Sequence, residues 1–177
     1  MPNWCNCVLK IKGEPDELED FNQSMKTPGT LKFQDFVPVP EKVTATSDVI
    51  DWRYTNWGTK WDLSDNDDQL MNRSYDGTVL SFTFQTAWGP PKPFIETVSE
   101  QFPHLEFCIS YYEPLGAFAG YVGYIDGCEN DHTYCEWESD GEYNRAYMDT
   151  PEQYKAAWEA PAEYNESDEE STSAEED

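Results

Sequence analysis

The sequence predicts an α+β fold in which strands and helices alternate along the chain. Val79–Gln85 alternates apolar with polar residues, the period of a strand that buries one face. Lys92–Phe102 then places apolar residues on one face of a helix, and Leu105–Tyr112 alternates again. A strand, a helix and a strand joined by short connections are typical of half of a split β-α-β unit.

The N-terminal part shows the same order of strand and helix. Asn3–Gly13 alternates like a strand, with Cys5 and Cys7 on its apolar side. Pro15 and the acids around it suit the first turn of a helix, where both are favoured. The sequence therefore predicts two related strand–helix halves.

The middle of the chain carries weaker patterns. Leu31–Pro40 is typical of an extended segment, whose prolines exclude it from a central strand. Glu41–Asp51 has no clear period, and the tryptophan-rich Trp52–Leu63 is expected to fold over the core. Ser64–Gly77 is polar, acidic and rich in turn residues, which predicts an exposed loop.

After the second half, the sequence predicts an appended hairpin and a short helix. Ala117–Ile125 is typical of a strand, and Asp126-Gly127 is a hairpin signal. The return strand is expected at His132–Glu138, because Cys128–Asp131 can lengthen the loop. Pro151–Ala160 then predicts a short helix with proline at its first position.

Charge is the most unusual property of the chain. It has 36 acids and 11 bases, a net charge of −25, and residues 126–177 alone hold 18 acids and 2 bases. Residues 162–177 hold no base, which predicts disorder. Such a field repels nucleic acid and anionic lipid and attracts basic surfaces. We therefore expect no direct nucleic-acid binding, no membrane binding, and a basic protein as partner.

The N-terminus and the cysteines predict a cytoplasmic protein. The first residues show neither the basic nor the apolar region of a signal peptide. No run approaches the roughly 20 apolar residues that span a bilayer. The five cysteines follow no disulfide spacing, which fits reduced thiols.

Four short motifs follow one another within residues 1–125. They are Met1–Asn6 (MPNWCN), Asn56–Asp62 (NWGTKWD), Thr86–Pro91 (TAWGPP) and Tyr111–Pro114 (YYEP), the last leading to Phe118–Gly120 (FAG). In this order they resemble the YubB-type ferredoxin-like domain family, small proteins carried by phages and plasmids. The resemblance implies a ferredoxin-like antiparallel sheet with two helices on one face and a mobile-element origin. It implies no catalytic residues.

With that resemblance, the chain divides into three expected parts. Residues 1–125 form the ferredoxin-like core. Residues 126–160 form an acidic hairpin and helix extension packed on that core, and residues 161–177 form a disordered acidic tail.

The first candidate site is the set of acids that follows the core. Carboxylates fixed on strands and turns can stand in for the phosphates of a duplex, which carries about one charge per 1.7 Å of axis. A solubilising surface with a floppy tail explains the same acids. The candidate partner-binding residues are Asp126, Glu129, Asp131, Glu136, Glu138, Asp140 and Glu142.

The second candidate site is a tryptophan cluster. Aromatic rings with a cation and two carboxylates can stack a base or hold a small ligand. A tryptophan-capped core with an ion pair from Lys60 to Asp62 or Glu113 explains the same residues. The candidate ligand-binding residues are Trp57, Lys60, Trp61, Asp62, Trp88, Tyr112 and Glu113.

Metal and nucleophile chemistry find little support in the sequence. Neither Cys5 with Cys7 nor Cys128 with Cys135 has the spacing of a zinc-binding pair. The two histidines belong to no recognisable nucleophile motif. We therefore predict no metal, no cofactor and no catalytic residue.

These patterns predict a non-enzymatic phage or plasmid protein. It binds and inhibits a basic, nucleic-acid-handling host protein by acidic DNA mimicry, in the manner of an anti-restriction or anti-CRISPR protein. The alternative is a small-ligand or nucleotide-binding protein, a sponge or an enzyme, that uses the tryptophan cluster. A structural phage component that forms a homodimer through a sheet edge is a third interpretation.

Overall fold

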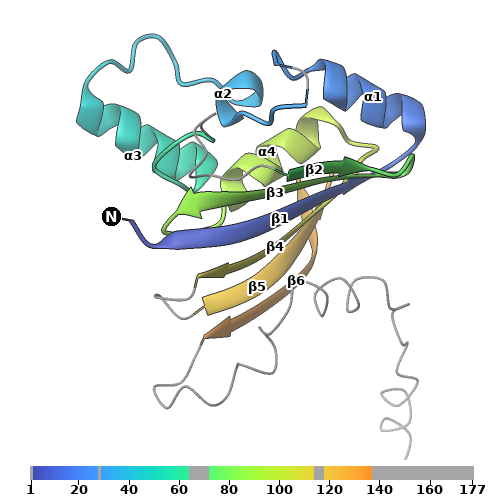
Figure 1. Cartoon of the computed structure of the whole chain (residues 1–177). Coiled ribbons are helices and arrows are strands. Elements are labelled where there is room, and N and C mark those ends of the chain that lie inside the picture. The colour runs from blue at the N-terminus through green and yellow to red at the C-terminus, as the bar shows by residue number, and fades with distance from the viewer. Residues whose placement is uncertain (1, 28, 64–71, 114–117, 137–177) are drawn as a thin grey trace, which may run out of the picture. The chain divides into compact units, whose positions relative to one another are not determined.

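The computed structural model describes residues 2–27, 29–63, 72–113 and 118–136. Within these residues, six antiparallel strands form one sheet, and the helices lie on one side of it (Figure 1). The elements are β1 Trp4–Lys12, α1 Pro15–Gln23, α2 Phe33–Phe36, α3 Thr46–Trp57, β2 Asn72–Tyr75, β3 Val79–Ala87, α4 Lys92–Gln101, β4 Glu106–Glu113, β5 Phe118–Ile125 and β6 Cys128–Glu136.

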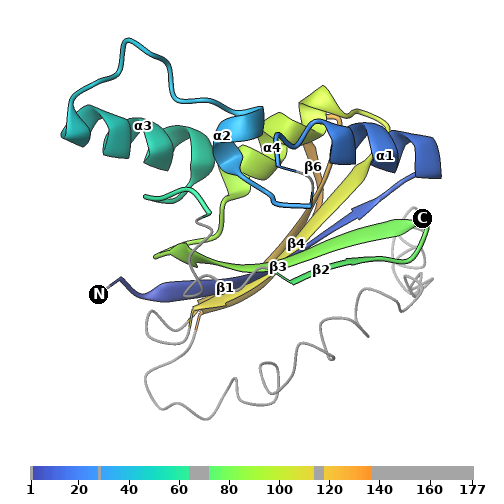
Figure 2. The ribbon, with the colours of Figure 1, turned by 45° about the horizontal axis from the view of Figure 1, so that its top comes forward.

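The order of the strands in the sheet is β2-β3-β1-β4-β5-β6. Helix α4 therefore connects β3 to β4, two strands that β1 separates, and β3 likewise separates β1 from β2 (Figure 2). Two interleaved units of this kind make the ferredoxin-like arrangement. The predicted α+β fold is confirmed, and β5 and β6 extend the same sheet beyond β4.

The core lies between the sheet and the helices. Alternate residues of β1, among them Cys5, Leu9 and Ile11, are almost completely buried. The inward residues of β3 and β4 pack beside them, as the alternation in the sequence predicted. Helices α1 and α4 cover this face with apolar side chains that include Phe21 and Phe94.

Helix α2 corrects the prediction of an extended segment at residues 31–40. The side-chain carboxylate of Asp62 accepts hydrogen bonds from the backbone N–H groups of Phe33 and Gln34, at 2.6 and 3.1 Å. These are donors in the first turn that the helix itself leaves unpaired. Asp62 stands far along the chain, so no local pattern could indicate this cap.

Helix α3 and strand β2 are further differences from the prediction. In α3 only Trp57 is buried, so the helix has no apolar stripe that a period could reveal. Strand β2 is an edge strand whose four residues are all exposed, so its sequence is polar throughout and predicts a loop instead of a strand.

The predicted hairpin at Asp126-Gly127 is confirmed, and it is tight. Both residues have positive φ, 49° and 71°, as a two-residue type I′ turn requires. Ile125 therefore pairs directly with Cys128, and the return strand begins there without a longer loop. The helix predicted at residues 151–160 and the tail predicted at residues 162–177 lie outside the described residues.

The capping role of Asp62 can be tested by substitution. Asp62→Ala removes the acceptor for Phe33, Gln34 and the N–H of Leu63. We expect the free energy of unfolding to fall by about 1–3 kcal/mol. Asp62→Asn keeps one acceptor oxygen and should cost less. Urea denaturation of the three proteins measures both effects.

The wild type and the Asp62→Asn variant also test the titration of Asp62. Burial raises the pKa of Asp62, against the opposing effect of its backbone hydrogen bonds. The stability that this group contributes is therefore present below its ordinary pKa and is lost as pH rises through the raised value. Relative to Asp62→Asn, the wild type should lose stability as pH rises from the ordinary pKa of an aspartate, about 4, to the raised value. A gain over that range would show that the hydrogen bonds outweigh burial.

Candidate functional site

The tryptophan cluster predicted from the sequence divides between the core and the surface. Trp57 has no exposed area, and its indole N–H donates a hydrogen bond to the carbonyl of Val37 at 2.8 Å. Its ring packs edge-on against Phe33 at 5.7 Å between centroids. Trp57 is therefore a core residue and cannot contact a ligand in this conformation.

The two acids of that cluster also have structural surroundings. The carboxylate of Asp62 is engaged by backbone N–H groups at the start of α2. Glu113 is buried at the end of β4, and Tyr112 points to the opposite face of the sheet from Glu113. Within the described residues, Lys60 makes no ion pair with Asp62 or Glu113, so the ion pair of the alternative interpretation, a tryptophan-capped core, does not form.

The other three predicted residues, Lys60, Trp61 and Trp88, lie together at the surface. Two aromatic residues outside the predicted set, Trp4 and Tyr54, contact them. The ammonium of Lys60 lies over the rings of Trp61 and Trp88, 5.0 and 5.2 Å from their centroids. Trp61 also contacts the ring of Trp4 at 6.2 Å, and Trp88 stacks on Tyr54 at 6.2 Å with 9° between the planes. We call these five side chains the aromatic corner.

The aromatic corner is held by backbone contacts between distant segments. The hydroxyl of Thr59 donates to the carbonyl of Ala87 and accepts from its N–H, at 3.0 and 3.1 Å. The N–H of Trp88 donates to the carbonyl of Asn3 at 2.8 Å. Gly58 ends α3 at φ 79°, where a Cβ atom would lie 2.8 Å from Pro93. Three of the four motifs found in the sequence thus meet here.

The rings of the aromatic corner are unusually accessible. Trp88 is 44% exposed, Trp61 37% and Tyr54 36%. Trp88 also has φ 67°, a conformation that is a genuine outlier for a bulky residue. Exposed, strained aromatic residues cost stability in the free protein, which is a reason to look for a binding role.

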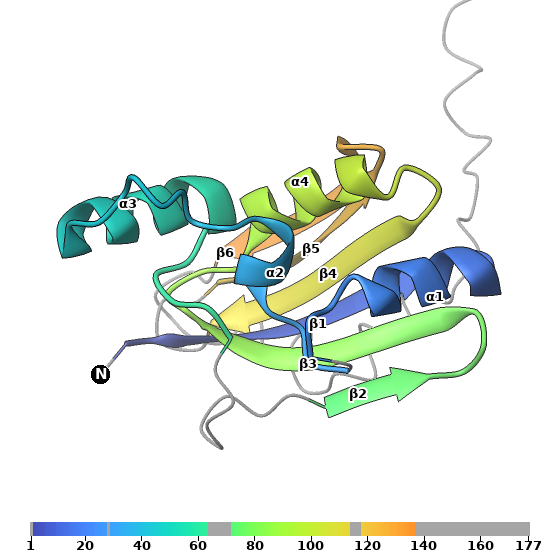
Figure 3. The ribbon, with the colours of Figure 1, turned by 90° about the horizontal axis from the view of Figure 1, so that it is seen from above.

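The predicted acidic site lies at the other end of the sheet, where β5 turns into β6 (Figure 3). Asp126, Glu129 and Asp131 are exposed there. Glu136 ends β6 opposite Phe118, at the end of the sheet away from the turn, so the structure does not bring it together with these three acids. Glu138, Asp140 and Glu142 lie outside the described residues.

Helix α4 adds two acids that the prediction left out. Glu96 and Glu100 are exposed on α4, and the methylene carbons of Glu100 pack against Gly127. Tyr124 is affected by the negative charge of these acids. Burial, and then the charges of Glu129 and Glu96, raise the pKa of its hydroxyl to about 12. We call this set the acidic end; its members are Glu96, Glu100, Asp126, Glu129 and Asp131.

Hydrogen bonds fix the acidic end to the fold. The N–H of Gly127 donates to the hydroxyl of Ser99 at 2.9 Å, which joins the turn to α4. The hydroxyl of Tyr121 donates to the carboxylate of Asp131 at 2.8 Å. The turn is therefore held to α4, and the carboxylate of Asp131 has a defined position.

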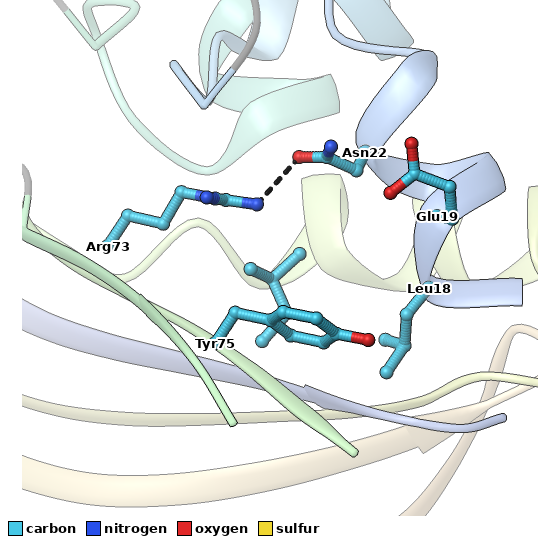
Figure 4. A pocket seen from close by; sticks show the side chains of 6 residues that line it. Leu18, Glu19, Asn22, Arg73 and Tyr75 are labelled. Atoms are coloured by element: carbon cyan, nitrogen blue, oxygen red, sulfur yellow. Dashed lines mark hydrogen bonds between the residues drawn. The ribbon is translucent and has the colours of Figure 1, made fainter. Parts of the chain in front are cut away.

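A hollow beside the β2 edge is too small for a nucleotide. It lies between α1 and β2, where the guanidinium of Arg73 donates to the side-chain oxygen of Asn22 at 2.8 Å (Figure 4). Its volume is about 20 Å³, room for a water molecule. Leu18, Glu19, Leu80 and Tyr75 line the rest of the hollow, and its size makes it a packing gap.

Of the cysteines whose side chains the structure describes, Cys5, Cys7 and Cys108 are buried and Cys128 is exposed. Cys5 and Cys7 lie in the core, and the neighbouring Cys7 and burial raise the pKa of the Cys5 thiol. Burial likewise raises the pKa of Cys108 to about 12. No three histidine, cysteine or acidic side chains among the described residues form a group that could hold a metal ion.

Comparison with known proteins places the chain in a family. Residues 56–151 match the family model described as "Ferredoxin-like domain in Api92-like protein". The chain belongs to the Api92-like family. No curated protein matches the sequence.

A solved structure agrees with this Api92-like assignment at the level of the fold. The crystal structure of protein api92 from Yersinia pseudotuberculosis has a TM-score of 0.54 to this chain at 12% identity. The match covers 78% of this chain and 99% of the other. None of the helices formed by the described residues has the length and apolar character needed to cross a membrane.

Some signals for the overlooked residues were present in the sequence of this Api92-like protein. Trp4 belongs to the first motif, and the register of β1 with β3 places it opposite Ala87, beside Trp88. Tyr54 carried no comparable signal, because α3 shows no helical period. Glu96 and Glu100 occupy the exposed side of the predicted helix, but only the sheet order brings that helix to the hairpin.

The strain at Trp88 can be measured with two truncations. Trp88→Gly and Trp88→Ala remove the same ring, but only glycine adopts φ 67° without a steric cost. We therefore expect Trp88→Gly to be more stable than Trp88→Ala by about 1–2 kcal/mol. Chemical denaturation of both variants measures the difference. Equal stabilities would mean that residue 88 relaxes out of the left-handed region once the ring is gone.

Proposed function

We propose that this protein inhibits a basic, nucleic-acid-handling protein by binding it through the acidic end. One observation supports the proposal above the others. Exposed carboxylates from α4, from the β5–β6 turn and from β6 lie at one end of the sheet, on elements joined by hydrogen bonds. Glu129 is on the same face as helix α4, and Asp131 is on the other face, where it pairs with Gly123. A rigid carboxylate array can match a basic surface without ordering itself on binding.

The electrostatics of this end favour a cationic partner. The net charge of −25 attracts basic surfaces over a long range and accelerates their encounter. Helix α4 ends at Gln101, near the hairpin, and a helix C-terminus carries a partial negative charge. The same field opposes binding of DNA, RNA or an anionic membrane.

Within this proposal the carboxylates replace DNA phosphates. A basic groove that binds a duplex presents lysine and arginine side chains along the phosphate backbone. An acidic protein that occupies such a groove blocks the enzyme without any chemistry of its own. A phage or plasmid origin suits this role, because such elements benefit from inhibitors of restriction or CRISPR nucleases.

The proposal is tested by reversing charge at the acidic end. The variant Asp126→Lys, Glu129→Lys, Asp131→Lys is compared with Glu41→Lys, Asp48→Lys, Asp51→Lys, which makes the same charge change at exposed acids elsewhere. Immobilised wild type is incubated with host lysate, and retained proteins are identified by mass spectrometry. We expect the wild type to retain basic nucleic-acid-binding proteins. The first variant should reduce their retention at least about tenfold more than the second variant does.

Two further measurements separate mimicry from general attraction. Duplex DNA should displace the retained protein, because both occupy one groove, and the affinity should fall steeply between about 0.05 and 0.2 M salt. Retention that is equal in both variants, or that survives at about 1 M salt, would contradict the proposal.

A small-ligand or nucleotide site at the aromatic corner is the second proposal. The position of Lys60 over two indole rings favours it, since that cation could meet a phosphate while a base stacks on Trp88. Only Lys60, Trp61 and Trp88 of the seven residues predicted for this site come together at the surface. Quenching of tryptophan fluorescence by nucleotides, lost in Trp88→Gly, is the expected result.

A further inference from the structure

The aromatic corner presents more donors than acceptors. Within the described residues, the indole N–H groups of Trp4, Trp61 and Trp88 donate to no acceptor, unlike that of Trp57. The ammonium of Lys60 adds further donors. The hydroxyl of Tyr54 is the one side-chain oxygen of the corner. A ligand that suits this surface therefore offers hydrogen-bond acceptors and has few donors of its own that require an acceptor from the protein.

The shape of the aromatic corner is a short row of rings. Neighbouring centroids are 6.2 Å apart from Trp4 to Trp61, 6.4 Å from Trp61 to Trp88 and 6.2 Å from Trp88 to Tyr54. Fully extended, such a row is about as long as six residues of a polyproline II helix, which rises about 3.1 Å per residue. Lys60 lies over Trp61 and Trp88, and Tyr54 stacks on Trp88, so the accessible apolar area is the exposed remainder of each ring and the grooves between neighbouring rings. Such grooves suit a ligand with rigid apolar ridges.

Charge and hydrogen-bonding capacity argue against several classes of ligand for this surface. A chain with a net charge of −25 repels single-stranded nucleic acid, which otherwise stacks on exposed aromatic rings. The same charge opposes docking of a second copy. A sugar presents hydroxyl donors and acceptors in equal measure, and the corner has a single oxygen to receive its donors.

We propose that the aromatic corner is a docking surface for a proline-rich segment in the polyproline II conformation on a partner protein. Proline offers a carbonyl acceptor and no N–H, which complements the free indole donors. Its rigid apolar ring packs against exposed tryptophan and tyrosine side chains, and the preformed helix loses little entropy on binding. Basic residues beside the prolines add attraction to the acidic protein.

This surface is separate from the acidic end. Strand β1 runs from Trp4 at the aromatic corner to Lys12, which pairs with Glu106 at the other end. Nine strand residues span roughly 25–30 Å, several times the screening length of about 8 Å at physiological salt. The inference therefore goes beyond the proposed inhibition through the acidic end, and each can fail without the other. It competes with the nucleotide proposal for the same surface.

The test uses a synthetic peptide of six prolines with an arginine at each end, titrated into the full-length protein. Tryptophan fluorescence and calorimetry follow binding, and a peptide with alanines in place of the prolines is the control. We expect the proline peptide to bind at least about tenfold more tightly than the alanine peptide. No binding up to about millimolar peptide, or equal affinity for both peptides, would overturn the proposal.

Variants locate the contact. Trp61→Leu keeps an apolar side chain but loses the flat ring, and Trp88→Gly suits the backbone at φ 67°. Each should weaken binding about tenfold or more, as loss of an aromatic hot spot does. Tyr75→Ala removes a ring that is 49% exposed on β2, and it should leave the affinity unchanged. If Trp61→Leu and Trp88→Gly are folded and bind like the wild type, the assignment is wrong.

Other occupants give different results in the same assays. Sedimentation that shows a wild-type dimer, dissociated by Trp61→Leu, would assign the surface to a second copy. Binding of a thymidine oligonucleotide or a nucleotide more tightly than the proline peptide would assign it to nucleic acid or its monomers. Lysine substitutions at Asp126, Glu129 and Asp131 should change peptide affinity less than about threefold in about 0.15 M salt.

Discussion

The structure depends on the pairing of β1 with two neighbours at once. Trp4–Lys12 forms a ladder with β3 along its whole length and with β4 from Asn6 onward. Because side chains alternate between faces, these two registers decide which residues of three strands enter the core. A slip of one residue would expose Leu9 and Ile11 and bury Lys10 and Lys12, a cost that fixes the register.

The same registers position both candidate surfaces. Where β1 begins, it brings Trp4 beside Ala87, and Thr59 joins that edge to the end of α3. Where β1 ends, Lys12 meets Glu106, which in turn pairs with Ile125 next to the acidic hairpin. A rigid central strand thus separates an aromatic surface that carries the cation of Lys60 from an acidic one, and a partner could engage either end without disturbing the core.

The comparison of candidate residues shows how burial sorts a cluster that looks uniform in sequence. Trp57 and Trp61 are four residues apart, yet Trp57 fills the core while Trp61 stays exposed. Gly58 separates them by ending α3 in the left-handed region, so the chain turns away from the core just after Trp57. The carboxylate of Asp62 then accepts hydrogen bonds from backbone N–H groups at the start of α2, which explains why this acid is structural.

Much of the fold was determined by the sequence alone, because it rests on periodic burial. The strands at β1, β3, β4 and β5, the helices α1 and α4 and the Asp126-Gly127 turn all carry local signals of period or turn chemistry. The tertiary structure alone decided α2, α3 and β2, because a distant carboxylate, a single buried residue and a neighbouring strand define them. It also decided which tryptophans are accessible, because exposure depends on what packs over a ring, and sequence spacing does not record it.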